Sequence, residues 1–177
     1  MKMKKLKKGQ KGFTLVELLI VIAITGLITG GITATIFQVF NINTRNTNRM
    51  TAVRQVQQAG FWVSPDVQMS QNVTPDEEDS GFPLTLTWEE WATGNNHTVV
   101  YTLVDMSGGL KKLQRSHSVN GGNSTVTPVA EYINPDQTSC YPLGVLPPGG
   151  VLTFNVTATV GGQSETRVYE VEPRPDS

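Results

Sequence analysis

Histidine, cysteine and clustered carboxylates are the side chains that most often carry chemistry in proteins, and this sequence has few of them. The only histidines are His97 and His117, and the only cysteine is Cys140. None of them has the spacing of a metal-binding motif, and no glycine-rich phosphate loop or serine elbow accompanies them. We therefore expect no catalytic residue, no metal site and no cofactor. Both histidines fall in strand-like segments with alternating polar neighbours, which predicts two surface side chains.

Cys140 and an acidic run are the other candidates. A single thiol cannot form an internal disulfide, so Cys140 is expected to be a partly buried, small apolar residue. Residues 76–79 read Asp-Glu-Glu-Asp. Calcium takes six to eight oxygen ligands, but this run lacks the spacing of a recognised calcium loop. A solvated acidic turn is the favoured interpretation, and calcium binding there stays open.

One carboxylate lies where a charge is unexpected. Residues 13–40 read FTLVELLIVIAITGLITGGITATIFQVF, and Glu17 is their single charged side chain. As a helix this run is about 42 Å long, and a hydrocarbon core is about 30 Å thick. A carboxylate inside lipid costs about 2–3 kcal/mol or more and usually has a partner and a function. The alternative is a glutamate close enough to the helix start to reach the interface.

The charge of the chain is distributed unevenly. Residues 1–12 contain six lysines and no acid, which leaves the remainder with eight basic against fifteen acidic side chains. Lysines before an apolar helix stay in the cytoplasm, so the C-terminal body is expected on the other side of the membrane. An acidic body repels phosphate backbones, so we expect no direct contact with nucleic acid.

The segment Lys11–Ile24, KGFTLVELLIVIAI, closely resembles the processing motif of type IV prepilins and type II secretion pseudopilins. The resemblance implies that a prepilin peptidase cuts after Gly12 and methylates the new N-terminus, Phe13. It also implies that Glu17 matches the family's glutamate, which pairs with the Phe13 ammonium of a neighbouring subunit and sets the axial register of a filament. The other implied partners are further pilin or pseudopilin subunits, an inner-membrane assembly platform and membrane lipid.

The helical pattern continues beyond the apolar run. Three glycines, Gly26, Gly30 and Gly31, interrupt the apolar run. They indicate either a close approach between helices or a point where the helix is less stable, and both interpretations stay open. A second stripe then recurs at helical spacing and predicts a face that packs on a sheet. Its members are Met50, Val53, Val56, Gly60, Val63 and Val67. Pro65 is expected to kink or restart the helix, and residues 72–81 to end the helical region.

The second half reads as strands. Alternation and turn residues predict strands at residues 83–88, 97–105, 110–118, 124–133, 151–160 and 164–171. Gly161-Gly162 supplies the last hairpin turn, and Pro128 indicates an edge or a break. The expected fold is α+β and pilin-like: a long N-terminal helix, first transmembrane and then amphipathic, packed on an antiparallel sheet. The expected divisions are a leader at 1–12, a membrane helix at 13–40 and an extracytoplasmic domain at 41–177.

The body resembles J-type minor pseudopilins and related minor pilins more than major subunits. The resemblance lies in the helix from Arg54 to Asn72, in Trp88, Tyr101, Leu113 and Arg115, and in Val129–Ile133. It implies a minor subunit that initiates or tips a type IV pilus or type II secretion filament, and no enzyme. A major subunit is one alternative. A membrane-anchored extracytoplasmic binding domain that never polymerises is the other.

Overall fold

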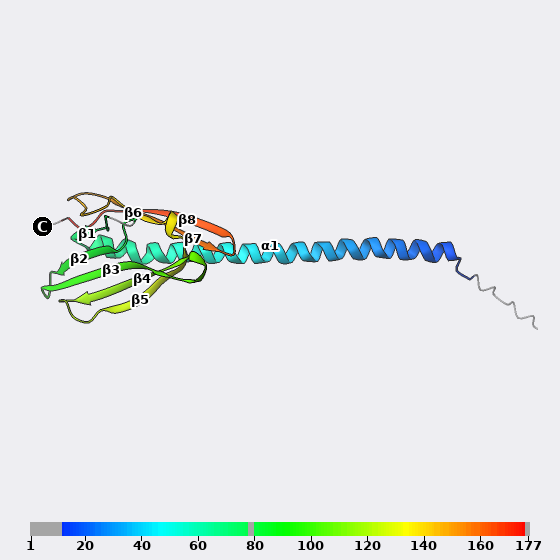
Figure 1. Cartoon of the computed structure of the whole chain (residues 1–177), viewed down its shortest axis with the longest axis horizontal. Helices are drawn as coiled ribbons and strands as arrows, with labels where there is room; N and C mark the ends of the chain where they lie inside the picture. The colour runs from blue at the N-terminus through cyan, green and yellow to red at the C-terminus, as the bar shows by residue number, and fades with distance from the viewer. Residues whose placement is uncertain (1–11, 78–79, 176–177) are drawn as a thin grey trace, which may run out of the picture. The chain divides into compact units, whose positions relative to one another are not determined.

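The computed structural model describes residues 12–77 and 80–175 (Figure 1). The six lysines of the predicted leader therefore lie outside the described residues. Contacts within the chain divide it into two compact units, Met1–Thr44 and Arg45–Ser177. One helix, α1 (Leu15–Met69), contributes to both units.

In the first unit, α1 buries nothing within the chain. Every described residue from Gly12 to Thr44 is exposed, including large apolar side chains such as Leu18 and Ile22. Among the described residues, α1 alone is long and apolar enough to cross a membrane. The hydroxyls of Thr25, Thr33 and Thr35 donate to the carbonyl oxygens four residues earlier, which satisfies them inside an apolar environment. The exposed apolar surface therefore requires lipid or other helices around it.

In the second unit, the C-terminal part of α1 covers a sheet. Its buried face contains Ala52, Val56, Ala59, Gly60, Val63, Asp66 and Val67. The prediction is confirmed from Val56 onwards but is wrong for Met50, whose side chain is 58% exposed. The small Ala52 and Ala59 replace it on the buried face because they allow the sheet to approach the helix closely. Gly60 serves the same purpose, since a Cβ there would overlap the ring of Tyr169.

The expectation that the helix restarts at Pro65 is wrong, because α1 continues through Pro65 to Met69, and a kink there stays a prediction. Proline removes one backbone donor and crowds the preceding turn. Here the ring lies on the exposed side of the helix, while Val63, Asp66 and Val67 are buried against the sheet on the other side. Packing on the buried side therefore holds the last turn in place.

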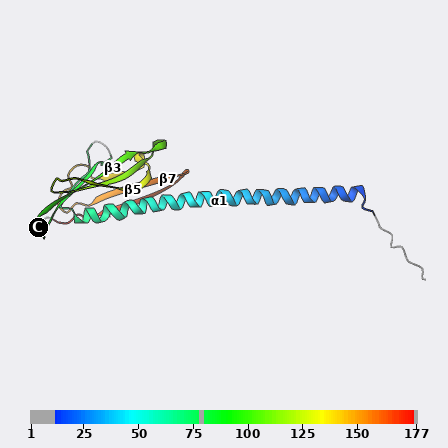
Figure 2. The same ribbon diagram turned by 90° about the horizontal axis from the view of Figure 1, so that it is seen from below.

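Eight strands form one antiparallel sheet in the order β1-β2-β3-β4-β5-β7-β6, with β8 paired to β7. In Figure 2 the strands lie to one side of the C-terminal part of α1. The α+β, pilin-like fold is confirmed, and each of the six predicted strands is present. The strands are β1 (Asn72–Thr74), β2 (Leu84–Glu90), β3 (Asn95–Asp105), β4 (Lys111–Val119), β5 (Thr125–Ile133), β6 (Ser139–Tyr141), β7 (Leu152–Val160) and β8 (Gln163–Val171).

The sheet curls so that its first and last strands meet. The backbone N–H of Cys140 donates to the Ser80 carbonyl at 2.8 Å, and that of Leu146 donates to the Val73 carbonyl at 2.9 Å. The loop after β6 therefore covers the edge of β1. This loop, residues 142–150, connects β6 to β7 and also closes the sheet. Cys140 is fully buried, whereas the sequence predicted partial burial, and burial raises the pKa of its thiol.

Pro128 lies in β5, where β5 pairs with β7 only at Ile133 and Ala158. The register against β4 shifts near Leu113, which marks a bulge. Proline can occupy this position because the other edge of β5 is unpaired over most of its length among the described residues. The prediction of an edge or break at Pro128 is confirmed.

Candidate functional site

The first candidate site is the start of α1, where the sequence placed Gly12, Phe13 and Glu17. The Thr14 hydroxyl accepts a hydrogen bond from the Glu17 backbone N–H at 3.3 Å, so Thr14 caps the helix. Thr14 and Glu17 have the Thr-x-x-Glu spacing of a capping box, which the sequence interpretation had not used. The Glu17 carboxylate also lies near the positive end of the helix dipole. Glu17 can therefore also stabilise the start of its own helix.

The groups at this end are all accessible. Phe13 is 81% exposed, and nothing lies within 4 Å of the position of a Cβ at Gly12. Among the described residues, no hydrogen bond or ion pair reaches the Glu17 carboxylate. A carboxylate in an apolar helix that has no partner among the described residues requires water, lipid headgroups or a cation.

Comparison with known protein families finds one match. The family described as the prokaryotic N-terminal methylation motif matches residues 7–33, which include Gly12, Phe13 and Glu17. Searches of the curated proteins and of the solved structures find no match. The chain thus carries an N-terminal methylation motif of the pilin and pseudopilin type, followed by a long apolar helix. These features fit a single-pass, membrane-anchored protein of a structural class that prepilin peptidase processes.

A second cluster of functional groups, which the sequence did not predict, joins α1 to the sheet. Asp66 on α1 is 4% exposed and accepts hydrogen bonds from the Tyr101 hydroxyl at 2.5 Å and from Arg115 Nε at 2.6 Å. Arg115 Nη2 donates to the other carboxylate oxygen at 3.0 Å, which makes the ion pair bidentate. The guanidinium also lies 5.5 Å from the centre of the Trp62 ring. We refer to Asp66, Tyr101 and Arg115 as the Asp66 cluster.

The Asp66 cluster affects the ionisation of its members. The hydrogen bond to Asp66 raises the pKa of Arg115, and burial followed by the Asp66 charge raises the pKa of Tyr101. Arg115 and Tyr101 thus remain protonated donors at any physiological pH. Asp66 is the acceptor for both, and the cluster fixes how the last turns of α1 lie on β3 and β4.

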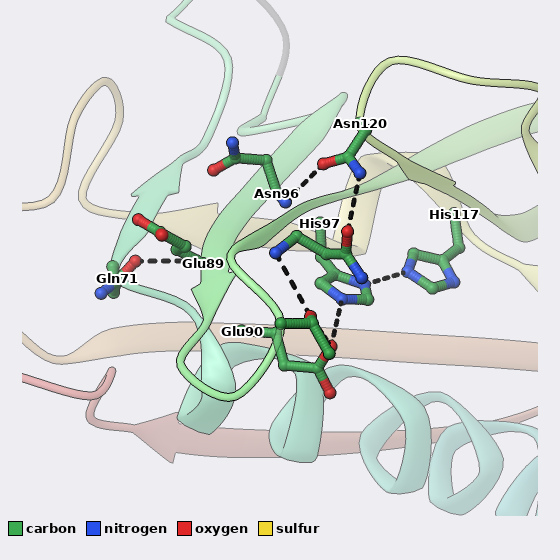
Figure 3. A network of polar contacts seen from close by, with 9 residues as sticks. Gln71, Glu89, Glu90, Asn96, His97, His117 and Asn120 are labelled. Carbon is green, nitrogen blue, oxygen red and sulfur yellow. Dashed lines mark hydrogen bonds and ion pairs between the residues drawn. The ribbon is translucent and has the colours of Figure 1, made fainter.

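The predicted surface positions of His97 and His117 are wrong. The two imidazoles share a hydrogen bond of 3.0 Å between His97 Nδ1 and His117 Nε2 (Figure 3). Both rings also stack on Trp88. His97 Nε2 faces Glu90 Oε2 at 3.8 Å, and the His97 side chain is 17% exposed. Alternation along β3 and β4 places both histidines on the same face as Tyr101 and Arg115. This face is directed toward α1, which explains their partial burial.

Partial burial makes the contribution of His117 to stability sensitive to pH. Desolvation, then the charges of Arg115 and His97, lower the pKa of His117, while Asp66 opposes this effect weakly. A lowered pKa in the folded state means that the unfolded chain binds a proton more readily. The stability that neutral His117 contributes is then present above its unfolded pKa of about 6.5 and is lost as the pH falls below it.

His117→Gln is therefore expected to reduce the pH dependence of stability. Glutamine keeps an amide that can bond His97 but does not titrate. Between about pH 7.5 and about pH 5, the melting temperature of the wild-type chain in detergent micelles should fall further than that of the variant. Circular dichroism at a series of pH values measures both. Parallel curves for the two proteins would contradict this account of His117.

The remaining candidates show no converging ligands. Within the described part of the chain, no group of three or more His, Cys, Asp or Glu side chains could hold a metal ion. Of the acidic run, Glu78 and Asp79 lie outside the described residues, Glu77 is exposed and Asp76 is half-buried. The solvated acidic turn therefore stays a prediction.

Proposed function

We propose that this chain is a minor subunit of a type IV pilus or type II secretion filament, and that it helps to initiate or tip that filament. The observation that carries the proposal is the methylation motif at residues 7–33 together with the apolar N-terminal part of α1, in which every described residue up to Thr44 is exposed. Neighbouring helices in a filament core supply the cover that this surface lacks. The body acts outside the cytoplasm, and no catalytic step is assigned to it.

In the proposed filament, Glu17 pairs with the N-terminal ammonium of Phe13 in an adjacent subunit. Supporting this, the Glu17 carboxylate has no partner among the described residues of its own chain, and Phe13 is exposed. Two charges that would each be costly alone in an apolar core neutralise one another. Because both groups lie at the same end of α1, pairing between chains favours one axial offset between them.

Processing at Gly12 is the first step that the proposal requires. Gly12→Leu places a branched side chain next to the bond to be cut, and we expect the leader to stay attached in most of the protein. Extended backbone is readily adopted by glycine, whereas a side chain can collide with a peptidase site. Intact mass measured on the membrane fraction of cells that contain the peptidase tests this. Complete processing of the variant would exclude Gly12 as a determinant.

The minor role is tested by stoichiometry. We expect quantitative mass spectrometry of sheared filaments to find this chain at a small fraction of the dominant subunit. Its presence as the dominant species would make it a major subunit. Its absence from filaments, with the leader still attached in the membrane fraction, would favour a membrane-anchored binding domain that never polymerises.

A further inference from the structure

A hollow at the edge of the second unit is lined by Gln71, Glu89, Trp91 and Arg174 and has a volume of about 400 Å³. Trp91 is 85% exposed, which is more than any other large apolar side chain in the described residues. The other three lining residues are polar or charged. One exposed indole beside three polar or charged side chains differs from the core of an apolar docking face, which contains several large apolar side chains.

The turn that carries Trp91 is braced on both sides. The backbone N–H groups of Thr93 and Gly94 donate to the Glu90 carbonyl at 3.2 and 2.8 Å. Across the turn, the Asn120 side chain accepts from the Asn96 N–H and donates to Asn95 Oδ1, each at 2.8 Å (Figure 3). These bonds hold the hairpin that presents the indole to solvent, so binding does not have to order the backbone first.

The polar residues that line the hollow are also held in place by hydrogen bonds, and their side chains keep donors and acceptors that a ligand can use. Gln71 Oε1 accepts the Glu89 backbone N–H at 2.9 Å (Figure 3), which leaves the Gln71 amide N–H groups free to donate. The Arg174 backbone N–H donates to the Ser70 carbonyl at 3.1 Å and fixes the C-terminal segment there. Among the described residues, no ion pair or hydrogen bond uses the Glu89 carboxylate or the Arg174 guanidinium.

We propose that this hollow binds a carbohydrate chain. A pyranose ring has one face of C–H groups, which stacks on an indole, and a rim of hydroxyls that donate and accept together. The Trp91 indole supplies the stacking surface. The Glu89 carboxylate supplies hydrogen-bond acceptors, and the Gln71 amide and the Arg174 guanidinium supply hydrogen-bond donors. A second hollow of about 260 Å³ shares Gln71 and Arg174 and continues past Pro147 and Pro173. The site therefore accommodates more than one sugar ring.

The observations favour a saccharide over a protein partner. The core of a protein interface is built from several aromatic and aliphatic side chains, whereas Trp91 is the one large apolar residue lining the first hollow. The second hollow adds Val145 and Leu146 but no aromatic side chain. The carbohydrate proposal goes beyond the filament proposal and does not depend on it, because the second unit presents the same hollow whether or not the chain polymerises.

Titration of the full chain in detergent micelles with cellotriose, maltotriose and triacetylchitotriose tests the proposal. Tryptophan fluorescence and saturation-transfer NMR are the readouts. We expect at least one trisaccharide to bind with a Kd of about 1 mM or tighter. Trp91→Ala should weaken that binding about tenfold or more, and Glu89→Gln should weaken it less.

Phe61→Ala is the matched control, since Phe61 is an aromatic side chain on α1 that is 72% exposed and does not line the hollow. This variant should bind the trisaccharide as the wild type does. The proposal is overturned if none of the three sugars binds, or if Trp91→Ala binds them with unchanged affinity. It is also overturned if Trp91→Ala abolishes only association with a second copy of the chain.

Discussion

Replacing Glu17 with leucine is expected to reduce filament yield about tenfold or more while the protein still enters the membrane. Under the proposed pairing, the variant leaves the Phe13 ammonium of a neighbouring subunit in an apolar core without its carboxylate. Removing one partner of a buried ion pair costs about 3–5 kcal/mol, and a loss of this size at each contact is enough to prevent assembly. Insertion should not suffer, because leucine extends the apolar run. Immunoblots of sheared and membrane fractions measure both quantities.

Thr14→Ala is the control that separates pairing from helix capping. The Thr14 hydroxyl caps α1 by accepting the Glu17 backbone N–H, so its removal weakens the helix start by about 1 kcal/mol. The Glu17 carboxylate remains in this variant, and filaments should persist. If Glu17→Leu gave a normal yield, the pairing role would be excluded. If Thr14→Ala and Glu17→Leu reduced the yield equally, capping would be the function of this end.

Arg115→Met should destabilise the second unit by about 3–5 kcal/mol, because it leaves the buried Asp66 carboxylate without its bidentate partner. Asp66 is 4% exposed, so water cannot replace the guanidinium without opening the contact between α1 and the sheet. Urea denaturation of the full chain in micelles, followed by tryptophan fluorescence, measures the change. Trp62 lies beside Arg115 and reports the same region.

Lys111→Met provides the matched control for Arg115→Met. Lys111 Nζ lies 3.3 Å from Asp105 Oδ1, but the Asp105 side chain is 90% exposed. Exposed pairs contribute about 0–1 kcal/mol, so this variant should be nearly as stable as the wild type. The triple variant Asp66→Leu, Tyr101→Phe, Arg115→Met removes every polar group of the Asp66 cluster and should recover part of the loss. Equal effects of Arg115→Met and Lys111→Met would contradict the structural role of the cluster.

The features that were predictable from the sequence are those that depend on residues close to one another along the chain. The apolar run, its single carboxylate and the basic segment before it are each readable within a few residues, as is the glycine turn at Gly161-Gly162. Alternation located six strands to within two residues at either end. The strands β1 and β6 were missed because each has three residues, which is too short for a period of two to be recognised.

The side-chain clusters were not predictable in the same way because they depend on strand register. Tyr101 lies opposite Arg115, and Val99 lies opposite His117, only once β3 and β4 are paired. The alternation of side chains along β3 could have indicated the burial of His97, since His97 and Tyr101 lie on the same face of the strand as the buried Val99. Residues 110–118 were predicted as a strand, but the polar neighbours of His117 within it led to the wrong surface assignment for this residue. The burial of Asp66 on α1 follows from its partner on β4 and has no local signature.

Processing at Gly12 and assembly into a filament through the new N-terminus are tested most directly by the mass of the N-terminal peptide, recovered from filaments sheared from cells. We expect a peptide that begins at Phe13 and carries one additional methyl group on its amine. A peptide that still contains the lysine leader, found only in the membrane fraction, would contradict both the processing and the assembly.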